Sequence, residues 1–414
     1  MKIAFVVQGF PHLSETFILN QITGLLDRGH AVDIFAFVRV AAPVLHPDIE
    51  AYQLLRRARY VTVPKDKWAR VRSGLGLLRA KLGRYPGVIL RALDVLTFRI
   101  DALSLTLLHQ VAPFLDGYDI IHCQYGTVGN RLAALKKLGL PGKLVTTFHG
   151  WDLRMGLAQG GGLYRDLFAA GDRFLSISRF SRATLLQLGL AEDKIVDHPV
   201  GIDLRRFPFK WAAGAQAETR RDAIRLITVA RLVPEKGLPH AVQALQRLGQ
   251  RLPGLRLEYA LVGDGPQREE LAGLIRASGL EGVAQLLGPR DQAGVAAEML
   301  RSDIFLLPSV AEVLPVSLME AQAVGLPVVA TRVGAADEVL SEAATEFLAP
   351  PGDPEALADR LARLIARQER WPEFGQAGRR HVAARFDVNV LNDRLVALYQ
   401  DLLAEPGRAG RGRG

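Results

Sequence analysis

Residues 308–331, which read PSVAEVLPVSLMEAQAVGLPVVAT, decide the fold that we expect for this chain. The stretch follows one short apolar run, Ile304–Leu307, and ends in another, Val328–Thr331. Between them, Pro315 marks the start of a helix and Gly325 marks its end. A strand, a loop, a helix and a strand in this order are typical of a parallel sheet covered by helices.

Two glutamates in this stretch, Glu312 on the loop and Glu320 in the helix, predict a particular kind of ligand. A helix N-terminus at the carboxyl edge of a parallel sheet attracts phosphate, because its first N–H groups lack acceptors and the helix dipole is positive there. A carboxylate repels phosphate but accepts hydrogen bonds from hydroxyl groups. The pair therefore favours a nucleotide sugar, which has hydroxyl groups on both sides of its diphosphate. Taken singly, each glutamate is more often an ordinary solvated residue.

The composition indicates a folded protein with two domains. A chain of 414 residues is too long for one ordinary core, and 49% hydrophobic with 23% charged residues is a globular composition. The sole cysteine, Cys123, excludes an internal disulfide and a cysteine-based zinc site. No apolar run is long enough for a secretory signal or a membrane span, so we expect a cytoplasmic protein.

The first half of the chain alternates strands with helices. We expect strands at Lys2–Val7, 31–38, Asp119–Cys123, Lys143–Phe148, 173–178 and 194–200, and helices from Ser14 to about Arg28, at 129–138 and at 181–188. A glycine loop at Gln8–Pro11 follows the first strand. This order predicts a doubly wound sheet, whose ligands gather at the carboxyl ends of the strands. Gly9 and His149 then lie at that edge, although a lone histidine is more often structural than functional.

Residues 44–110 interrupt this alternation with a helical segment rich in leucine and arginine. Twelve basic residues between Arg56 and Arg99 are opposed by only three aspartates, Asp66, Asp94 and Asp101. Such a segment suits the interface of an anionic membrane, and it equally suits a solvated helical face packed on the domain. Nucleic acid is a poorer partner, because no set of aromatic residues for base stacking accompanies the arginines.

The second half repeats the architecture of the first. We expect strands at 225–230, 255–262, 283–287 and 304–307, a loop at Arg231–Gly237, and helices at 238–252, 353–367, 371–385 and 389–403. The predicted organisation is an N-terminal domain, 1–204; a linker, 205–221; a C-terminal domain, 222–385; a helix returning toward the first domain, 386–404; and a disordered tail, 405–414. The fold class is α/β, with two Rossmann-like parallel-sheet domains facing a cleft.

With these segments placed, the sequence resembles the retaining glycosyltransferases of the GT-B fold, family 4 or group 1, which share a Glu-x7-Glu motif. Glu312 and Glu320 have that spacing, and Arg231 with Lys236-Gly237 is similar to the group's Arg-x4-Lys-Gly loop. Val262-Gly-Asp-Gly-Pro266 and Gly201-Ile-Asp203 also match. Residues 10–17, FPHLSETF, and 147–152, TFHGWD, resemble the subgroup that builds exopolysaccharides such as colanic acid and amylovoran.

The resemblance implies that the N-terminal domain, 1–204, binds the acceptor and that the C-terminal domain, 222–385, binds the nucleotide sugar. It also implies a role for each matching residue. Arg231 and Lys236 would neutralise the donor diphosphate, Glu312 would hold the hydroxyl groups of the transferred sugar, and Glu320 would hold the ribose. His149 would reach the sugar from the acceptor domain. The backbone of Leu314, Pro315, Val316 and Ser317 would add donors to the phosphates, Gly263 would belong to the donor site, and Gly9 would let its loop approach the phosphates.

The reaction implied by the resemblance is transfer of a hexose from a nucleotide sugar, UDP-linked by family habit, to a lipid-linked glycan, with retention of configuration. No Asp-x-Asp occurs in the chain, so we expect neither a metal nor another cofactor. The family often has Gly-Phe or Gly-Ile after the first glutamate, and here Val313-Leu314 follows instead, which changes the expected shape of that loop. Two alternatives stay open: a nucleotide-sugar epimerase on the same fold, and a two-domain sugar-binding protein without catalysis.

Overall fold

The computed structural model describes residues 1–11, 16–41, 46–160, 162–211 and 223–405. Three predictions fall wholly or mostly outside these ranges: the helix cap at Ser14, the linker from residue 212 on, and the tail from residue 406 on. The chain divides into two compact units. The first unit comprises Met1–Ile177, Ser181–His198 and Leu391–Gly414, and the second comprises Ser178–Phe180 and Pro199–Val390.

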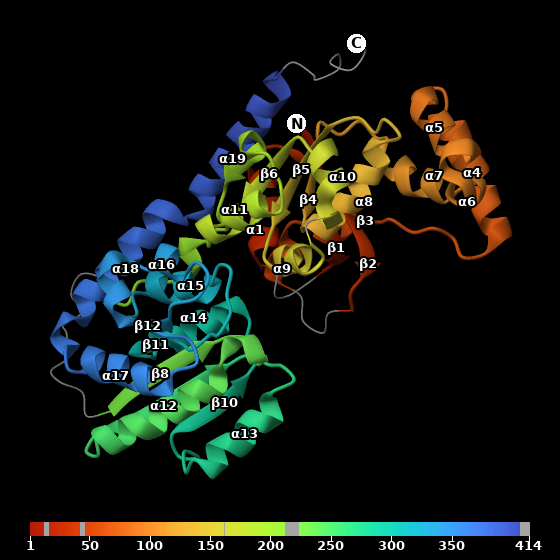
Figure 1. Cartoon of the computed structure of the whole chain (residues 1–414). Helices are drawn as coiled ribbons and strands as arrows, with labels where there is room; N and C mark the ends of the chain where they lie inside the picture. Colours follow the sequence, from red (N-terminus) through yellow and green to blue (C-terminus); the bar gives the residue numbers. More distant parts are fainter. Residues whose placement is uncertain (12–15, 42–45, 161, 212–222, 406–414) are drawn as a thin grey trace. The chain divides into compact units, whose positions relative to one another are not determined.

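A seven-stranded parallel sheet forms the centre of the first unit (Figure 1). Its strands, in spatial order, are β3 (Ala58–Tyr60), β2 (Ala31–Arg39), β1 (Lys2–Phe10), β4 (Ile120–Gln124), β5 (Lys143–Phe148), β6 (Arg173–Ser176) and β7 (Ile195–Asp197). The strand order reverses between β1 and β4, which is the topological switch point of a doubly wound sheet. Ligand sites in such sheets form at the carboxyl ends of the strands beside that point.

The helices of the first unit cover both faces of this sheet or lie to one side of it. They are α1 (Thr16–Asp27), α2 (Pro47–Ala51), α3 (Leu54–Arg57), α4 (Lys67–Lys81), α5 (Pro86–Ala92), α6 (Val95–Leu103), α7 (Thr106–Val111), α8 (Gly126–Lys136), α9 (Trp151–Ala158), α10 (Arg165–Ala170), α11 (Arg179–Gln187) and α19 (Val388–Ala404), with 3-10 turns at Ala112–Phe114, Gly162–Tyr164 and Glu192–Lys194. Figure 1 shows α4, α5 and α6 grouped to one side, clear of the sheet.

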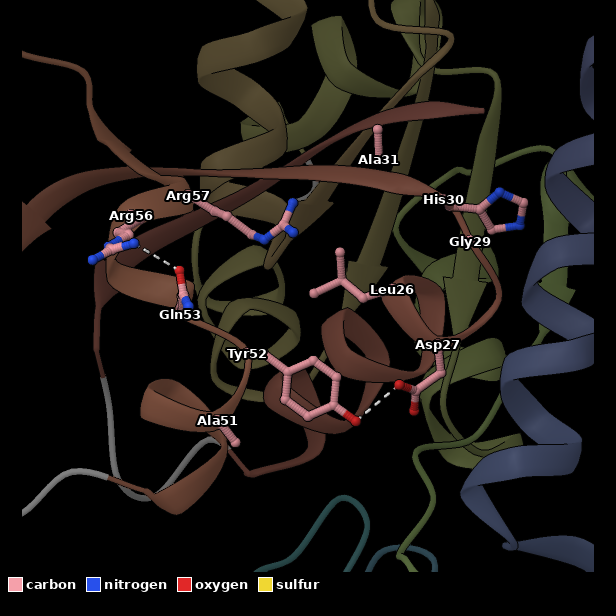
Figure 2. A pocket seen from close by; sticks show the side chains of 10 residues that line it. All are labelled: Leu26, Asp27, Gly29, His30, Ala31, Ala51, Tyr52, Gln53, Arg56 and Arg57. Atoms are coloured by element: carbon pink, nitrogen blue, oxygen red, sulfur yellow. Dashed lines mark hydrogen bonds between the residues drawn. The ribbon is translucent and has the colours of Figure 1, made fainter.

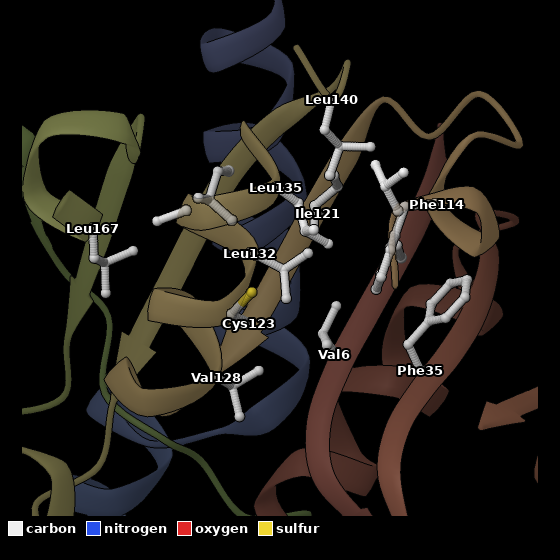
Figure 3. Packing of buried hydrophobic residues seen from close by; sticks show 14 of the residues in the cluster. Val6, Phe35, Phe114, Ile121, Cys123, Val128, Leu132, Leu135, Leu140 and Leu167 are labelled. Atoms are coloured by element: carbon white, nitrogen blue, oxygen red, sulfur yellow. The ribbon is translucent and has the colours of Figure 1, made fainter. Parts of the chain in front are cut away.

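The two faces of the sheet bury different side chains. On one face, Val6 and Cys123 pack with Phe35, Phe114 and Leu132 (Figure 3). Burial raises the pKa of the Cys123 thiol, so this residue is an inert core residue, as the sequence predicts. On the other face, Ile3, Phe5 and Val7 pack against α1 and against Leu395, Tyr399 and Leu402 of α19. The last helix of the chain therefore completes the core of the first unit.

The second unit repeats this arrangement with a six-stranded parallel sheet. Its strands, in spatial order, are β10 (Ala284–Gly288), β9 (Arg256–Val262), β8 (Ala223–Val229), β11 (Ile304–Leu307), β12 (Val328–Thr331) and β13 (Leu348–Ala349). Its helices are α12 (Leu238–Arg251), α13 (Arg268–Ala277), α14 (Gln292–Leu300), α15 (Val316–Val324), α16 (Ala336–Val339), α17 (Pro354–Ile365) and α18 (Trp371–Arg385), with 3-10 turns at Leu204–Arg206, Pro234–Lys236, Glu342–Phe347 and Gln368–Arg370. The order again reverses beside its first strand, between β8 and β11. The prediction of two Rossmann-like sheets is confirmed.

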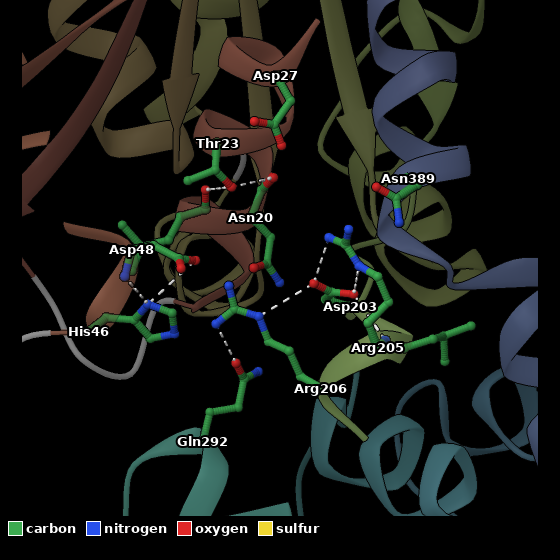
Figure 4. A network of polar contacts seen from close by, with 12 residues as sticks. Asn20, Thr23, Asp27, His46, Asp48, Asp203, Arg205, Arg206, Gln292 and Asn389 are labelled. Atoms are coloured by element: carbon green, nitrogen blue, oxygen red, sulfur yellow. Dashed lines mark hydrogen bonds and ion pairs between the residues drawn. The ribbon is translucent and has the colours of Figure 1, made fainter. Parts of the chain in front are cut away.

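The predicted motif Gly201-Ile-Asp203 has a structural role in the second unit. Asp203 caps the 3-10 turn that follows it and accepts two hydrogen bonds of 2.9 Å from the guanidinium of Arg205 (Figure 4). Burial alone would raise the pKa of Asp203, but the hydrogen bonds from Arg205 and the charges of Arg205 and Arg206 together outweigh it, so the pKa is lowered. Arg206 contacts the same carboxylate and donates to Gln292 Oε1 at 3.0 Å. The ionised Asp203 thus ties this turn to α14.

Strand β1 is longer than predicted, and this corrects the interpretation of Gly9. Residues Gln8 to Phe10 continue the strand, with Gly9 in register with Val38 and Phe10 with Arg39 of β2. Phe10 is 3% exposed, so extending the strand buries its ring while β2 satisfies the backbone. Gly9 is therefore a buried strand residue, and the predicted glycine loop is wrong.

The described part of the insertion, residues 46–110, is mainly helical as predicted, with one exception. It also supplies β3, a three-residue strand that pairs in parallel with β2 at the edge of the sheet. Ala58, Arg59 and Tyr60 are too few to show a strand pattern. The sequence pattern likewise did not indicate α14 or the two-residue strand β13 in the second unit.

Candidate functional site

The loop between β11 and α15 is the centre of the candidate site in the second unit. Helix α15 follows Pro315 as N-cap and ends at Gly325, which has a φ of 91°. Among the described residues, no acceptor binds the backbone N–H groups of Leu314, Val316 and Ser317. These three groups are available to an anion at the positive end of the helix dipole. Pro315 has no N–H, so its predicted part as a backbone donor is wrong, and it serves to start the helix.

Lys236 and Glu312 form an ion pair in this loop. The Lys236 ammonium donates to Glu312 Oε1, and the two side chains are 18% and 9% exposed. Ser309 Oγ donates to the same carboxylate oxygen at 2.7 Å. Ser309 is fully buried and its carbonyl accepts a hydrogen bond from Thr331 of β12. The predicted cation and the predicted first glutamate are thus in direct contact.

Gly237 explains why the lysine loop lies against the Glu312 loop. Its φ is 58°, and a Cβ on this residue would lie 2.2 Å from the carbonyl oxygen of Pro308. The neighbouring backbone is joined as well, because the N–H groups of Val310 and Ala311 donate to the carbonyl of Glu235 at 2.9 and 3.2 Å. A glycine is required here for both conformation and space. The Lys-Gly spacing of the motif therefore has a local physical cause.

Val313, which follows Glu312 where the family often has glycine, is buried, and its backbone is not left-handed. Val313 is 7% exposed, and it is absent from the described non-glycine residues with positive φ. Its carbonyl accepts a hydrogen bond of 3.1 Å from Ala335 N–H. Gly334, with a φ of 54°, packs so closely on the Glu312 carbonyl that a Cβ would lie 2.1 Å away. The segment after β12 thus shapes the loop that holds Glu312.

Glu320 is a partly buried carboxyl within α15 that no described residue pairs or hydrogen-bonds. Burial raises the pKa of Glu320 to about 7. An unpartnered carboxyl of this kind accepts hydroxyl groups well when it ionises. The predicted second glutamate therefore has the chemistry expected for binding a polyol such as ribose.

The remaining predicted donor-site residues lie where β8 and β9 end. Arg231 is exposed and has no described ion-pair partner, so its charge is available to a ligand. Gly263 packs against the backbone of Ala230, the residue before Arg231. A Cβ on Gly263 would lie 1.9 Å from the carbonyl oxygen of Ala230. Gly263 thus fixes the course of the Arg231 loop through backbone contact.

His149 follows β5 in the first unit, as predicted. Its Nε2 lies 2.6 Å from Gln124 Oε1, and its ring packs between those of Phe17 and Tyr125, with centroids 4.8 Å away in each case. Burial lowers the pKa of His149 to about 3, so the imidazole is neutral at physiological pH. A neutral imidazole is suited to hydrogen bonding and is a weak base.

Asp152 organises the backbone around His149. Its fully buried carboxylate accepts N–H donors from Gly126 at 2.8 Å, Gly150 at 2.8 Å, Leu153 at 3.0 Å and His149 at 3.1 Å. Burial raises the pKa of Asp152, and the four backbone donors oppose this effect without cancelling it. One carboxylate therefore joins the turn after β4 to the turn after β5.

Two family profiles match this chain. The profile "Glycosyltransferase Family 4" matches residues 14–206, and "Glycosyl transferases group 1" matches residues 210–381. WcaL of Salmonella typhimurium, named as a glycosyltransferase of colanic acid biosynthesis, is 32% identical over 417 residues, which cover 97% of this chain and 100% of WcaL. AmsK of Erwinia amylovora, an amylovoran biosynthesis glycosyltransferase, is 32% identical over 418 residues with the same coverage. The chain belongs to the family 4, group 1 glycosyltransferases.

Solved structures agree on the fold of this glycosyltransferase. Alr3699/HepE of Anabaena, solved with UDP, superposes with a TM-score of 0.70 over 97% of this chain and 100% of its own, at 19% identity. Sucrose-phosphate synthase of Thermosynechococcus elongatus gives a TM-score of 0.73 over 98% and 100%, at 18% identity. The GT-B fold predicted from the sequence is confirmed.

A separate pocket of about 780 Å³ in the first unit of the glycosyltransferase lies away from these residues. Its lining includes Tyr52, whose hydroxyl donates to Asp27 at 2.9 Å, and Arg56, which donates to Gln53 at 2.9 Å (Figure 2). The pocket is built around the amino ends of β2 and β3, the edge opposite to that of His149. We therefore give it no part in the transfer reaction.

The described residues of the glycosyltransferase contain no group of three or more His, Cys, Asp or Glu residues that could hold a metal ion. None of their helices is both long and apolar enough to cross a bilayer.

Three residues of the glycosyltransferase with a role in this geometry were not predicted as site residues: Ser309, Gln124 and Asp152. Ser309 stands three residues before Glu312, directly after a buried strand, and that position is the signal that could have identified it. Asp152 stands at the start of α9, where a carboxylate commonly binds backbone N–H groups. Gln124 is the last residue of β4 and gives no signal beyond its place at the carboxyl edge.

Proposed function

We propose that this glycosyltransferase moves a hexose from a nucleotide sugar, a UDP-sugar, to a lipid-linked glycan with retention of configuration. The relatives WcaL and AmsK, named for colanic acid and amylovoran biosynthesis, support a role in bacterial exopolysaccharide synthesis. We propose that the transfer serves exopolysaccharide or lipopolysaccharide synthesis at the cytoplasmic face of the membrane. Alr3699/HepE, which was solved with UDP-glucose, supports a UDP-sugar donor.

The observation that carries the proposal is the group of residues around the N-terminus of α15. Arg231 and Lys236 supply positive charge, and the N–H groups of Leu314, Val316 and Ser317 supply donors for the diphosphate. Glu312 and the unpartnered Glu320 supply acceptors for hydroxyl groups. Both halves of a nucleotide sugar are thus provided for within one unit.

The ion pair between Lys236 and Glu312 sets the order of events. In the free enzyme the ammonium neutralises Glu312. A bound diphosphate competes with Glu312 for Lys236. The sugar hydroxyl groups then replace the ammonium group of Lys236 on the Glu312 carboxylate. Binding of the donor thus gives Lys236 the diphosphate as its new partner and gives Glu312 the hydroxyl groups. No buried charge is left without a partner.

Transfer proceeds by substitution on one face of the sugar. The bond from the anomeric carbon to the β-phosphate oxygen breaks, and the acceptor oxygen forms its bond on the same face. The departing phosphate oxygen takes the acceptor proton, while Arg231 and Lys236 stabilise the charge that the diphosphate gains. This path uses no protein base and no metal, and His149 contacts the sugar.

Replacing Lys236 with alanine tests this assignment. We expect the turnover of a UDP-sugar to fall by about 10²- to 10³-fold, with a change in Tm of no more than a few degrees. Lys137→Ala is the matched control, because it also removes an ion pair, with Asp166 at 2.6 Å, on an exposed part of the first unit. Retention of full turnover by Lys236→Ala contradicts the assignment.

The products of the same assay separate the alternatives. Transfer of labelled sugar to a lipid extract supports the proposal. An epimerised nucleotide sugar without transfer identifies an epimerase, and binding without turnover identifies a sugar-binding protein.

We further propose that helices α4 to α6 bind an anionic membrane surface. Their large apolar side chains are unusually exposed: Trp68 is 83% exposed, Leu75 60%, Leu90 62%, Leu96 95%, Ile100 69% and Leu103 67%. Trp68, Val71 and Leu75 of α4 and Leu82 at its C-cap follow one another at helical spacing, while Gly74 and Leu77 lie against the protein. An apolar helical stripe left in solvent indicates a surface that another apolar phase covers.

The charge of this segment favours an anionic bilayer as that phase. Residues 62–104 contain nine Lys or Arg and three Asp, a net charge of +6 out of +9 for the whole chain. Lys67, Arg72, Arg79, Arg84 and Arg91 are exposed among the apolar side chains. Lipid phosphates complement these cations, and acyl chains complement Trp68 and the leucines.

Sedimentation with vesicles tests the membrane proposal. Vesicles of phosphatidylglycerol with phosphatidylcholine should bind the protein, and binding should fall as salt rises. Trp68→Glu with Leu96→Glu should lose at least tenfold in affinity, while Leu403→Glu, which alters an exposed leucine of α19, should bind normally. Equal binding of neutral vesicles would reject an anionic surface as the partner. Dimers by light scattering that Trp68→Glu abolishes would show that a second copy of the chain covers these helices.

A further inference from the structure

The ring of His149 is held more firmly than its position on a loop suggests. Phe17 from α1 and Tyr125 before α8 enclose it on two sides, and Gln124 holds Nε2 at 2.6 Å. Among the described residues, no hydrogen bond reaches Nδ1. The imidazole therefore has one nitrogen committed to the protein and one available to a ligand.

Gln124 is itself fixed by a buried chain of hydrogen bonds. It is fully buried at the end of β4, and its side-chain amide nitrogen lies 3.1 Å from Gln21 Oε1 and 3.4 Å from His122 Nε2. His122 is held in turn by Thr147 at 2.7 Å and by the hydroxyl of Tyr399 at 2.6 Å. With its NH₂ group directed at Gln21, the amide presents its oxygen to His149, which then donates from Nε2.

The backbone around this contact is specialised for it. Tyr125 has a φ of 77°, which a residue with a side chain rarely adopts. The next residue, Gly126, has no room for a Cβ, which would lie 2.2 Å from the ring of Phe148. Asp152 binds the N–H groups of both Gly126 and His149. A strained turn that places Gln124 and Tyr125 against one histidine indicates a built site.

We propose that Gln124 is a positioning residue: its amide oxygen holds His149 in the Nε2–H tautomer and so presents Nδ1 as the acceptor for a hydroxyl group of the sugar. The inference rests on the proposed function, in which His149 contacts the sugar, and it adds the tautomer, the accepting atom and the residue that fixes them. In the proposed same-face transfer the departing phosphate oxygen takes the acceptor proton, so His149 transfers none. Its task is a directional hydrogen bond whose geometry Gln124 sets.

The tautomer can be measured without any substrate. In protein labelled with ¹⁵N-histidine, long-range ¹H–¹⁵N spectra distinguish the protonated ring nitrogen from the bare one, and His149→Asn assigns the signal. We expect a single Nε2–H tautomer in the wild type and an exchanging mixture in Gln124→Leu. Gln322→Leu is the matched control, because it also removes a buried amide, with hydrogen bonds to Leu318 O and Val339 O, and it should leave the His149 signal unchanged.

Activity provides the second measurement. Gln124→Leu should lower kcat about tenfold with little change in the KM for the donor nucleotide. Gln124→Glu restores an oxygen acceptor and should recover most of that loss at pH 8. Its carboxylate also favours a charged imidazole, so its activity should fall toward pH 6, where the wild type stays level. Asp152 from α9, His122 from β4 and Tyr125 before α8 are the titratable groups beside the ring, and all variants retain them.

The outcomes separate this inference from the proposed function. A Nδ1–H or mixed tautomer in the wild type, or equal activities of the Leu and Glu variants, overturns the positioning role even if transfer is intact. The expected spectra together with full activity of His149→Asn leave the tautomer assignment standing and remove the contact of His149 with the sugar.

Discussion

Glu320→Gln is the substitution whose effect can be worked out most fully from the structure. Glu320 lies in α15 without a described partner, and burial raises its pKa from 4.5 to about 7. In the unfolded chain the same carboxyl ionises near its ordinary value. Between these two pKa values the folded state binds a proton that the unfolded state has lost. The stability contributed by protonated Glu320 is therefore present below pH 4.5 and is lost as the pH rises through about 7.

The size of this loss follows from the two pKa values. One pKa unit corresponds to about 1.4 kcal/mol, so a pKa raised from 4.5 to about 7 implies a loss of about 3 kcal/mol. Glutamine has nearly the same shape and does not ionise. The free energy of unfolding of Glu320→Gln should thus exceed that of the wild type by an amount that grows from near zero at pH 4.5 to about 3 kcal/mol at pH 8.

Urea denaturation at four pH values between 5 and 8 measures this difference. Subtracting the variant from the wild type removes the titration of every other group. Glu342→Gln, which removes an exposed carboxyl, controls for the change in net charge. A difference that stays flat from pH 5 to pH 8 refutes the reasoning, because it would show that Glu320 is ionised throughout or is paired in solution. UDP affinity should also rise with pH more steeply for the wild type than for Glu320→Gln, since ribose hydroxyl groups bind the ionised carboxylate.

Two further substitutions test how the loops are held. Gly237→Ala places a Cβ 2.2 Å from Pro308 O at a φ of 58°, and it should lower the free energy of unfolding by about 1 to 3 kcal/mol or more in urea denaturation. Gly249→Ala, which is in open space on α12, should not lower it. Equal stabilities of the two variants would contradict the close contact. Asp152→Asn replaces one carboxylate oxygen with an NH₂ group, which then faces backbone N–H donors. The free energy of unfolding should fall by about 1 to 3 kcal/mol, and hydrogen exchange at the Gly126 and Gly150 amides should accelerate. Unchanged exchange at both amides would argue against the shared carboxylate.

The sequence predicted the fold well because the decisive patterns are local. Apolar runs such as Ile304–Leu307 and Lys143–Phe148 match β11 and β5 in both bounds, since strands buried on both faces read as continuous apolar segments. The predicted helix at Trp371–Arg385 likewise matches α18. Short edge elements were missed, because the three residues of β3 and the two of β13 acquire their structure from a neighbouring strand.

The residues of the candidate site also fall into those that local patterns predict and those that only the folded structure shows. Arg231, Lys236, Glu312 and Glu320 follow from motif spacing, and the contact between Lys236 and Glu312 supports their grouping. Gly9 was misplaced because pairing with β2 overrides the tendency of glycine to end a strand. Gln124 depends on contacts with Gln21 and His149, which lie far from it in the chain, and no spacing records such contacts. Ser309 and Asp152 also bind near neighbours, and their positions gave a local signal. The raised pKa of Glu320 is a property of burial and became visible only in three dimensions.

The place of α19 in the core of the first unit has a consequence for biosynthesis. Leu395, Tyr399 and Leu402 are at most 2% exposed and contact residues from the first strand. A ribosome translates the whole second unit before these three side chains emerge. The growing chain therefore carries an open apolar groove beside Ile3, Phe5 and Val7 through most of its synthesis, and chaperones would find their target there. A premature stop before α19 would make that groove permanent, so late nonsense mutations should yield aggregated protein rather than a merely shortened enzyme.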